Sequence, residues 1–146
     1  MLFRSIGNTY TPDDKTTIKT EIGLSRFDAN TFSSIGKSND DGHAAKIAAQ
    51  RNFSVNLFNK NLLLKTSAGY EWVDKNFRPV ERLRPVEFSR DWGLPLLPNA
   101  ATEQLPSLSL SLGDDKNNRI LYRYTAYIRD DGFKGNRNEK IGRAHV

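Results

Sequence analysis

Alternation of apolar and polar residues is the feature of this 146-residue sequence that most restricts its fold. Successive side chains of a β-strand point to opposite faces, so alternation predicts strands that have one apolar and one polar face. The alternating segments are residues 16–26, 43–58, 61–74, 106–112 and 120–129. The sequence therefore predicts an all-β fold, an antiparallel meander of long hairpins with about five strands.

Residues 44–51 are the segment in which helix and strand compete. Their sequence, AAKIAAQR, is rich in residues of high helix propensity. We favour a strand, because the alternation continues into Phe53, Val55 and Leu57. A short helix is the alternative.

Two pairs of neighbouring segments are expected to form hairpins whose apolar faces coincide. In the first, Asn59-Lys60 forms a two-residue turn, because asparagine tolerates the positive φ that such turns require. In the second, the connection is the polar segment 113–119. The expected pairs are Leu57 with Leu62, Val55 with Leu64 and Ala49 with Tyr70, and then Leu112 with Ile120, Leu110 with Tyr122 and Leu108 with Tyr124.

The expected connections alternate between long and short. Residues 27–42 and 75–105 form long connections, whereas 59–60 and 113–119 form short ones. Barrels of the outer membrane have this pattern, with short periplasmic turns and long extracellular loops. Most of the segments also reach the roughly 9–11 residues with which a β-strand crosses a bilayer. The pattern favours an open part of a membrane β-barrel.

In a barrel, the apolar rows face lipid and the polar rows face a wet interior. Aromatic side chains near the strand ends, Tyr127 among them, resemble the girdles found at membrane interfaces. A soluble β-sandwich, for example a glycan-binding module, is the alternative, and there the same rows face a core. The candidates for lipid-facing or girdle positions are Phe53, Val55, Leu64, Tyr70, Trp72, Tyr122 and Tyr124.

The proline-rich segment 77–98 is expected to be an extended, partly ordered loop. Proline cannot donate a hydrogen bond to a central strand. Phe77, Phe88 and Trp92 are the expected anchors of this loop. Its charged residues are expected to pair with one another, namely Arg78, Arg82, Arg84 and Arg90 with Glu81, Glu87 and Asp91.

Composition and motifs argue against an enzyme. The chain has no cysteine, which excludes disulfides and thiolate metal sites. It has no phosphate-binding glycine loop and no Gly-x-Ser-x-Gly turn. The acidic pairs at Asp40-Asp41 and Asp114-Asp115 lack the ligand spacing of a calcium loop. The net charge of +5 is dispersed along the chain, so no nucleic-acid partner is expected. We expect no catalytic residue, cofactor or metal.

Both ends of the chain bear on its origin. No apolar stretch long enough for a transmembrane helix occurs, and the first residues do not form a signal peptide, which an envelope protein should have. The last residues, IGRAHV at 141–146, resemble a translated sequencing adapter, since ATC GGA AGA GCA CAC GTC encodes them. We expect residues 1–140 to be one incomplete domain from a metagenomic read, and 141–146 to be an artefact.

Several segments resemble large outer-membrane β-barrel proteins of Bacteroidetes. They are EIGLSRFDANTFS at 21–33, GHA at 42–44, VEFSRDW at 86–92 and FKGNR at 133–137. The resemblance implies a barrel in the outer membrane of a Gram-negative bacterium. Its partners would be the lipid bilayer and the rest of the barrel, while transport, secretion and adhesion all stay open as roles.

Overall fold

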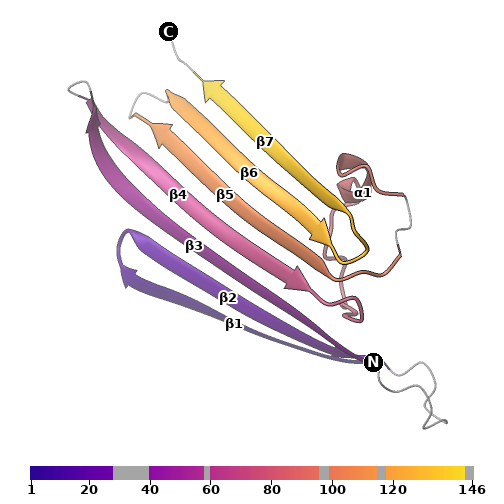
Figure 1. Cartoon of the computed structure of the whole chain (residues 1–146). Helices are drawn as coiled ribbons and strands as arrows, with labels where there is room; N and C mark the ends of the chain where they lie inside the picture. Colours follow the sequence, from indigo (N-terminus) through magenta and orange to yellow (C-terminus); the bar gives the residue numbers. More distant parts are fainter. Residues whose placement is uncertain (28–39, 58–59, 96–98, 115–117, 144–146) are drawn as a thin grey trace, which may run out of the picture.

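The computed structural model describes residues 1–27, 40–57, 60–95, 99–114 and 118–143. Within these residues, seven antiparallel strands form one open sheet in the order of the sequence (Figure 1). The all-β prediction is confirmed, although there are more strands than the five segments expected. The elements are β1 (Leu2–Asp13), β2 (Thr16–Arg26), β3 (Asp41–Leu57), β4 (Lys60–Val73), the short helix α1 (Phe88–Asp91), β5 (Glu103–Gly113), β6 (Arg119–Arg129) and β7 (Lys134–Arg143).

The register of the sheet joins the alternating patterns of neighbouring strands into two continuous faces. Across five strand pairs, apolar residues lie beside apolar residues. One such row consists of Tyr10, Ile18, Ala49, Ala68, Leu108 and Tyr124. We call this side the apolar face and the opposite side the polar face.

The connections between strands form two groups, one at each end of the sheet. The connections β1–β2, β3–β4 and β5–β6 lie at one end, which we call the turn end. The connections β2–β3, β4–β5 and β6–β7 lie at the other, the cap end. The expected loop 27–42 falls mostly on residues 28–39, outside the described residues. The four-residue connection 130–133 is short although it lies at the cap end.

The register of the β3–β4 hairpin differs from the prediction by two residues. Leu57 pairs with Lys60 instead of Leu62, and Val55 pairs with Leu62 instead of Leu64. A shift of two keeps every side chain on its face, so alternation cannot distinguish the two registers. Lys60 begins β4, while Asn59 lies outside the described residues. In the β5–β6 hairpin the predicted register is confirmed, since Leu112 pairs with Ile120, Leu110 with Tyr122 and Leu108 with Tyr124.

Residues 44–51 belong to β3, as the alternation predicted. This segment is paired on both sides, with β2 and with β4. Lys46, for example, lies opposite Glu21 on one side and Glu71 on the other. Pairing on both sides outweighs the modest helix propensity of alanine, lysine and glutamine.

The two edge strands were not predicted. In β1, Arg4 and Asn8 interrupt the apolar row. In β7 the side chains are largely polar on both faces, so no alternation is present. The row that continues the apolar face there consists of Lys134, Asn136, Asn138 and Lys140. Residues 141–143 complete β7, while 144–146 lie outside the described residues.

The packed part of the molecule lies on the polar face. Four of the five buried apolar side chains among the described residues belong to this face or to the connection between β4 and β5, namely Val73, Phe77, Ala101 and Tyr127, with Ala126 as the exception. The apolar face, by contrast, has many exposed side chains, among them Ile6, Ile22, Ile47, Leu108 and Ile120. No helix in the described part of the chain is long and apolar enough to cross a membrane.

Candidate functional site

The connection between β4 and β5 folds back over the polar face at the cap end of the sheet. We call its described residues, 74–95 and 99–102, the cap. The cap contacts the sheet at three places that lie on β2–β3, on β4–β5 and on β6–β7, and Figure 1 shows α1 beside the last of these. Side chains from segments far apart in the sequence meet here.

The first contact is the docking of Phe77 against two glycines. Phe77 is only 6% exposed. A Cβ atom added to Gly42 would lie 2.3 Å from the backbone nitrogen of Phe77, and one added to Gly23 would lie 2.9 Å from its ring. The Phe77 ring centroid also lies 6.0 Å from that of Phe3. The glycines leave the space that the cap occupies.

A buried serine fixes the cap beside this contact. The backbone N–H of Arg78 donates a hydrogen bond of 2.9 Å to Oγ of Ser25 on β2. Ser25 is only 4% exposed. Because a buried hydroxyl group is costly to leave without a partner, this bond holds the start of the cap to the sheet.

The second contact is an arginine that joins two strands. Arg84 bonds to Glu71 of β4 and donates from Nη2 to Oε2 of Glu103 of β5 at 2.9 Å. The three side chains are 20%, 22% and 21% exposed, in that order. Its guanidinium also lies 5.1 Å from the ring centroid of Phe88.

This pairing corrects the expectation that the charges of the loop satisfy one another. Arg84 pairs with glutamates of the sheet, while Arg90 and Asp91, 3.5 Å apart, form a pair within the segment. The register places Glu71 and Glu103 diagonally on the polar face, so two carboxylates share one cation. Partners this far apart in the sequence cannot be read from the loop alone.

The third contact is an aromatic cluster around Tyr127. This side chain has no exposed surface. Its ring centroid lies 5.1 Å from Phe88, 5.3 Å from Trp92 and 5.6 Å from Phe133. A Cβ atom added to Gly135 would lie 2.9 Å from the Trp92 ring. The expectation that Tyr127 belongs to an aromatic girdle is therefore wrong, because an odd position on β6 places it on the polar face.

Arg129 links the aromatic cluster to the β6–β7 connection. It is 4% exposed. Its guanidinium donates from Nε at 3.0 Å and from Nη2 at 2.7 Å to Oδ2 of Asp131, and from Nη2 to the carbonyl oxygen of Asn99 at 2.7 Å. The hydrogen bonds from Arg129 lower the pKa of Asp131 below its ordinary value.

The seven residues predicted for lipid-facing or girdle positions all lie on the apolar face. Phe53 pairs with Leu64 toward the turn end. Tyr70 is 42% exposed, and its hydroxyl donates to Oε1 of Gln104 at 3.0 Å. The hydroxyl of Tyr122 donates to Oδ1 of Asn138 at 2.9 Å. The others of this set are Val55, Trp72 and Tyr124.

The three predicted loop anchors lie on the other side of the sheet. Phe77, Phe88 and Trp92 belong to the cap and make the ring contacts described above. Phe88 begins the short helix α1, where an extended segment was expected. The backbone N–H groups of Asp91 and Trp92 donate to carbonyl oxygens four residues earlier, which closes this helical turn.

Among the described residues, no group of three or more histidine, cysteine, aspartate or glutamate side chains is placed to hold a metal ion. In each of the two acidic pairs of the sequence, one described aspartate has a side-chain partner, whereas Oδ2 of Asp40 is buried without a hydrogen-bond partner in the described part of the chain. Asp41 lies 3.6 Å from Arg26, and Asp114 accepts a hydrogen bond from the Asn118 side chain at 2.8 Å. Asp115 lies outside the described residues.

Comparisons with protein-family models, with curated proteins and with solved structures find no match for this chain.

Proposed function

We propose that this sheet is part of the wall of a β-barrel in the outer membrane of a Gram-negative bacterium. The apolar face contacts lipid, the polar face lines a wet interior, and the cap occupies part of that interior. The observation that carries the proposal is the distribution of packing. The cap covers the face that bears the charges, and the face that bears the aliphatic side chains has no cover in the described structure.

Exposure of the apolar face has a physical cost in water. Ile22 is 51% exposed, Ile47 48% and Leu108 40%, and all three lie on central strands. Full burial of such a side chain is worth about 1.5–3 kcal/mol. A large continuous apolar patch is typical of surfaces that contact a membrane or another protein. Lipid would cover this face along the whole length of its strands.

The polar face suits a hydrated interior. Its charged side chains form pairs, such as Arg123 with Glu139 at 3.0 Å and Lys46 with Glu71 at 3.9 Å. Outer-membrane barrels have polar residues toward the lumen and short turns at the periplasmic end. We assign the turn end to the periplasm and the cap end to the cell exterior. The cap would then narrow the lumen near its outer opening.

A soluble β-sandwich that acts as a binding module is the second candidate, and the polar edge strand β7 favours it. Lys134, Asn136, Asn138 and Lys140 continue the apolar row, and lysine in hydrocarbon is unfavourable by about 2–4 kcal/mol at the midplane. In a sandwich, a second sheet would cover the apolar face, and charged residues on an edge strand would prevent pairing with other molecules.

A pair of neighbouring positions on β5 distinguishes the two candidates. The chain contains no cysteine, so Leu108→Cys and Ser109→Cys each introduce a single labelling site. The labelled chain is folded into phosphatidylcholine vesicles, and quenching by spin-labelled lipid acyl chains is measured. The barrel predicts strong quenching of the label at 108 and little at 109. Equal weak quenching at both positions, with a folded chain that stays in the aqueous phase, would favour the sandwich.

A further inference from the structure

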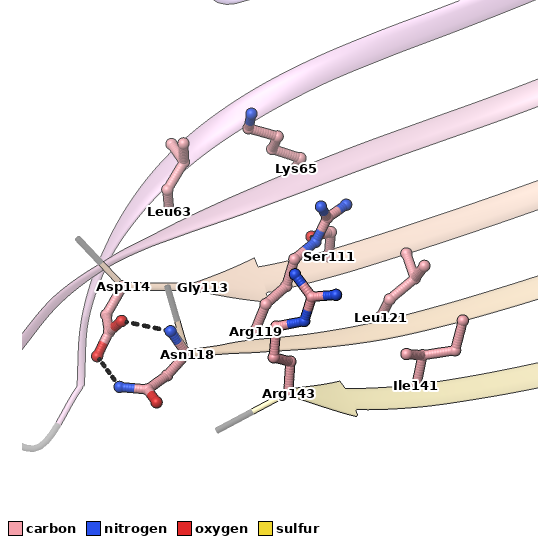
Figure 2. A pocket seen from close by; sticks show the side chains of 10 residues that line it. All are labelled: Leu63, Lys65, Ser111, Gly113, Asp114, Asn118, Arg119, Leu121, Ile141 and Arg143. Atoms are coloured by element: carbon pink, nitrogen blue, oxygen red, sulfur yellow. Dashed lines mark hydrogen bonds between the residues drawn. The ribbon is translucent and has the colours of Figure 1, made fainter. Parts of the chain in front are cut away.

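A cavity of about 410 Å³ lies on the polar face at the turn end, away from the cap. Side chains of β4, β5, β6 and β7 line it, and Figure 2 shows how they lie. Its volume lies within the range of about 300–1,000 Å³ that is usual for small-molecule sites. Its lining includes Leu63, Lys65, Ser111, Asp114, Arg119 and Leu121.

Two cations of this cavity differ from three arginines that lie on the polar face nearer the cap end. Arg84, Arg123 and Arg129 each pair with a carboxylate. Lys65 and Arg119 have no carboxylate partner among the described residues. Cations that a fold leaves without a counter-ion, at the rim of a cavity, attract an anion from solution.

The guanidinium of Arg119 is held in one orientation. Its Nε donates a hydrogen bond of 2.7 Å to Oγ of Ser111, which is only 7% exposed. This bond uses one edge of the guanidinium and leaves the two Nη groups for a ligand. A guanidinium that is fixed in this way can form two parallel hydrogen bonds to a phosphate or carboxylate group.

The carboxylate in the wall of the cavity is engaged in the turn. Asp114 accepts hydrogen bonds from the backbone N–H of Asn118 at 3.0 Å and from its side chain at 2.8 Å, as the dashed lines in Figure 2 show. These bonds close the β5–β6 connection. On the residues of β4 to β6 and their connection, the cavity has two cations, Lys65 and Arg119, against the one carboxylate of Asp114, so its net charge is positive.

Two aliphatic side chains of the polar face lie beside this cavity, one on β4 and one on β6. Leu63, 41% exposed, and Leu121 occupy positions where alternation predicts polar residues. On β7, Ile141 adds an aliphatic side chain and Arg143 a cation to the lining. Both belong to the adapter-like segment 141–146. The proposed site is therefore built from residues of β4, β5 and β6.

We propose that this cavity binds a small organic anion, a single phosphate or carboxylate group on a short aliphatic chain. Lys65 and Arg119 bind the anionic group, Ser111 orients Arg119, and Leu63 and Leu121 contact the aliphatic part. The site lies on the polar face, so it does not depend on whether lipid or protein covers the apolar face.

Titration of the 146-residue chain with butyl phosphate and with inorganic phosphate, followed by ³¹P NMR, tests the site. The chain is folded in zwitterionic micelles, and in buffer alone if it folds there, so that failure of the barrel proposal does not prevent the measurement. We expect butyl phosphate to bind about tenfold more tightly than inorganic phosphate, because about two of its methylene groups leave water.

Matched substitutions identify the residues responsible. Lys65→Gln and Arg119→Gln should each weaken butyl phosphate binding about tenfold. Lys19→Gln on β2 is the control, because Lys19 is an exposed lysine of the same face outside the cavity and its substitution removes the same charge. Arg119→Lys keeps the charge and loses the forked geometry, and it should restore only part of the affinity.

Two results would overturn the proposal. One is an equal loss of affinity in Lys19→Gln and Arg119→Gln, which would mean that the net charge of the protein alone attracts phosphate. The other is equal binding of butyl phosphate and inorganic phosphate, which would remove the aliphatic contact. The circular dichroism spectrum of each variant must match that of the parent. If Arg119→Gln does not fold, Lys65→Gln decides, since that side chain is exposed.

Discussion

Gly42 of β3 and Phe77 of the cap lie so close together that any side chain on Gly42 would meet the Phe77 backbone at 2.3 Å. The backbone of the cap cannot retreat from this contact without losing the hydrogen bond between Arg78 and the buried Ser25. A glycine in a central strand is thus required by the segment that lies above it.

Gly42→Ala should therefore displace the cap. We expect a loss of about 1–3 kcal/mol in the free energy of unfolding, as for other overpacked sites. Gly7→Ala is the control, since its added Cβ would meet only a carbonyl oxygen at 3.6 Å. Urea unfolding gives the stability, and limited proteolysis within residues 78–91 reports on the cap. Equal protease resistance of the two variants would contradict the assignment.

Arg84→Met should leave Glu71 and Glu103 on the polar face without their shared cation. Breaking a fully buried ion pair costs about 3–5 kcal/mol, and we expect about 2 kcal/mol here because the side chains are 20–22% exposed. Arg90→Met, at a side chain 77% exposed, should change stability by less than about 1 kcal/mol. The measurement is again urea unfolding. Adding Glu71→Gln and Glu103→Gln to Arg84→Met should recover much of the loss, and no recovery would show that repulsion is not the cause.

Tyr127→Ala should remove the centre of the aromatic cluster. Truncation of a large buried aromatic residue costs about 3–5 kcal/mol, and three ring contacts are lost here. Tyr124→Ala, on the opposite face of the same strand, is the matched change. With Trp72→Phe in both variants, so that Trp92 is the one remaining tryptophan, the fluorescence of Tyr127→Ala should shift to longer wavelength as water enters. If Tyr124→Ala shifted the spectrum as much, the two tyrosines would not lie on different faces.

Stability should decrease in acid in part through Asp131. Its pKa is lowered in the folded chain by hydrogen bonds from Arg129. The folded state therefore binds this proton more weakly than the unfolded state does. The contribution is present above the ordinary aspartate pKa of about 3.9 and is lost as the pH falls through the lower folded value. Asp131→Asn should lower the melting temperature at pH 7, and the difference from the parent should shrink at pH 3. A difference that stays constant between these pH values would count against this coupling.

The sequence predicts which face of the sheet a side chain lies on better than it predicts strand register or the edge strands. Alternation placed all seven apolar-face candidates on one side, because side-chain direction in a strand depends only on odd or even position. The same rule does not distinguish two registers of the β3–β4 hairpin that differ by two residues. Leu57 was therefore predicted to pair with Leu62, whereas it pairs with Lys60. The strand β7 was missed because polar or charged residues predominate on both of its faces.

The contacts of the cap were the least predictable feature. The loop sequence indicated that Phe77, Phe88 and Trp92 are anchors, but it did not indicate what they contact. Their partners are glycines and a tyrosine on strands far away in the sequence. Gly23 was visible as a glycine within a predicted strand, and such glycines often mark a place where another segment approaches closely. That signal could have identified where the cap docks.

The order of the seven strands restricts how a barrel could close. Each neighbour runs opposite to the last, so β1 and β7 point in the same direction. Joining these two edges directly, within one chain or between similarly oriented copies, would create a parallel seam. Barrels of bacterial outer membranes have an even number of antiparallel strands. A barrel that includes this sheet therefore requires an odd number of additional strands, and adding hairpins alone, two strands at a time, cannot close it.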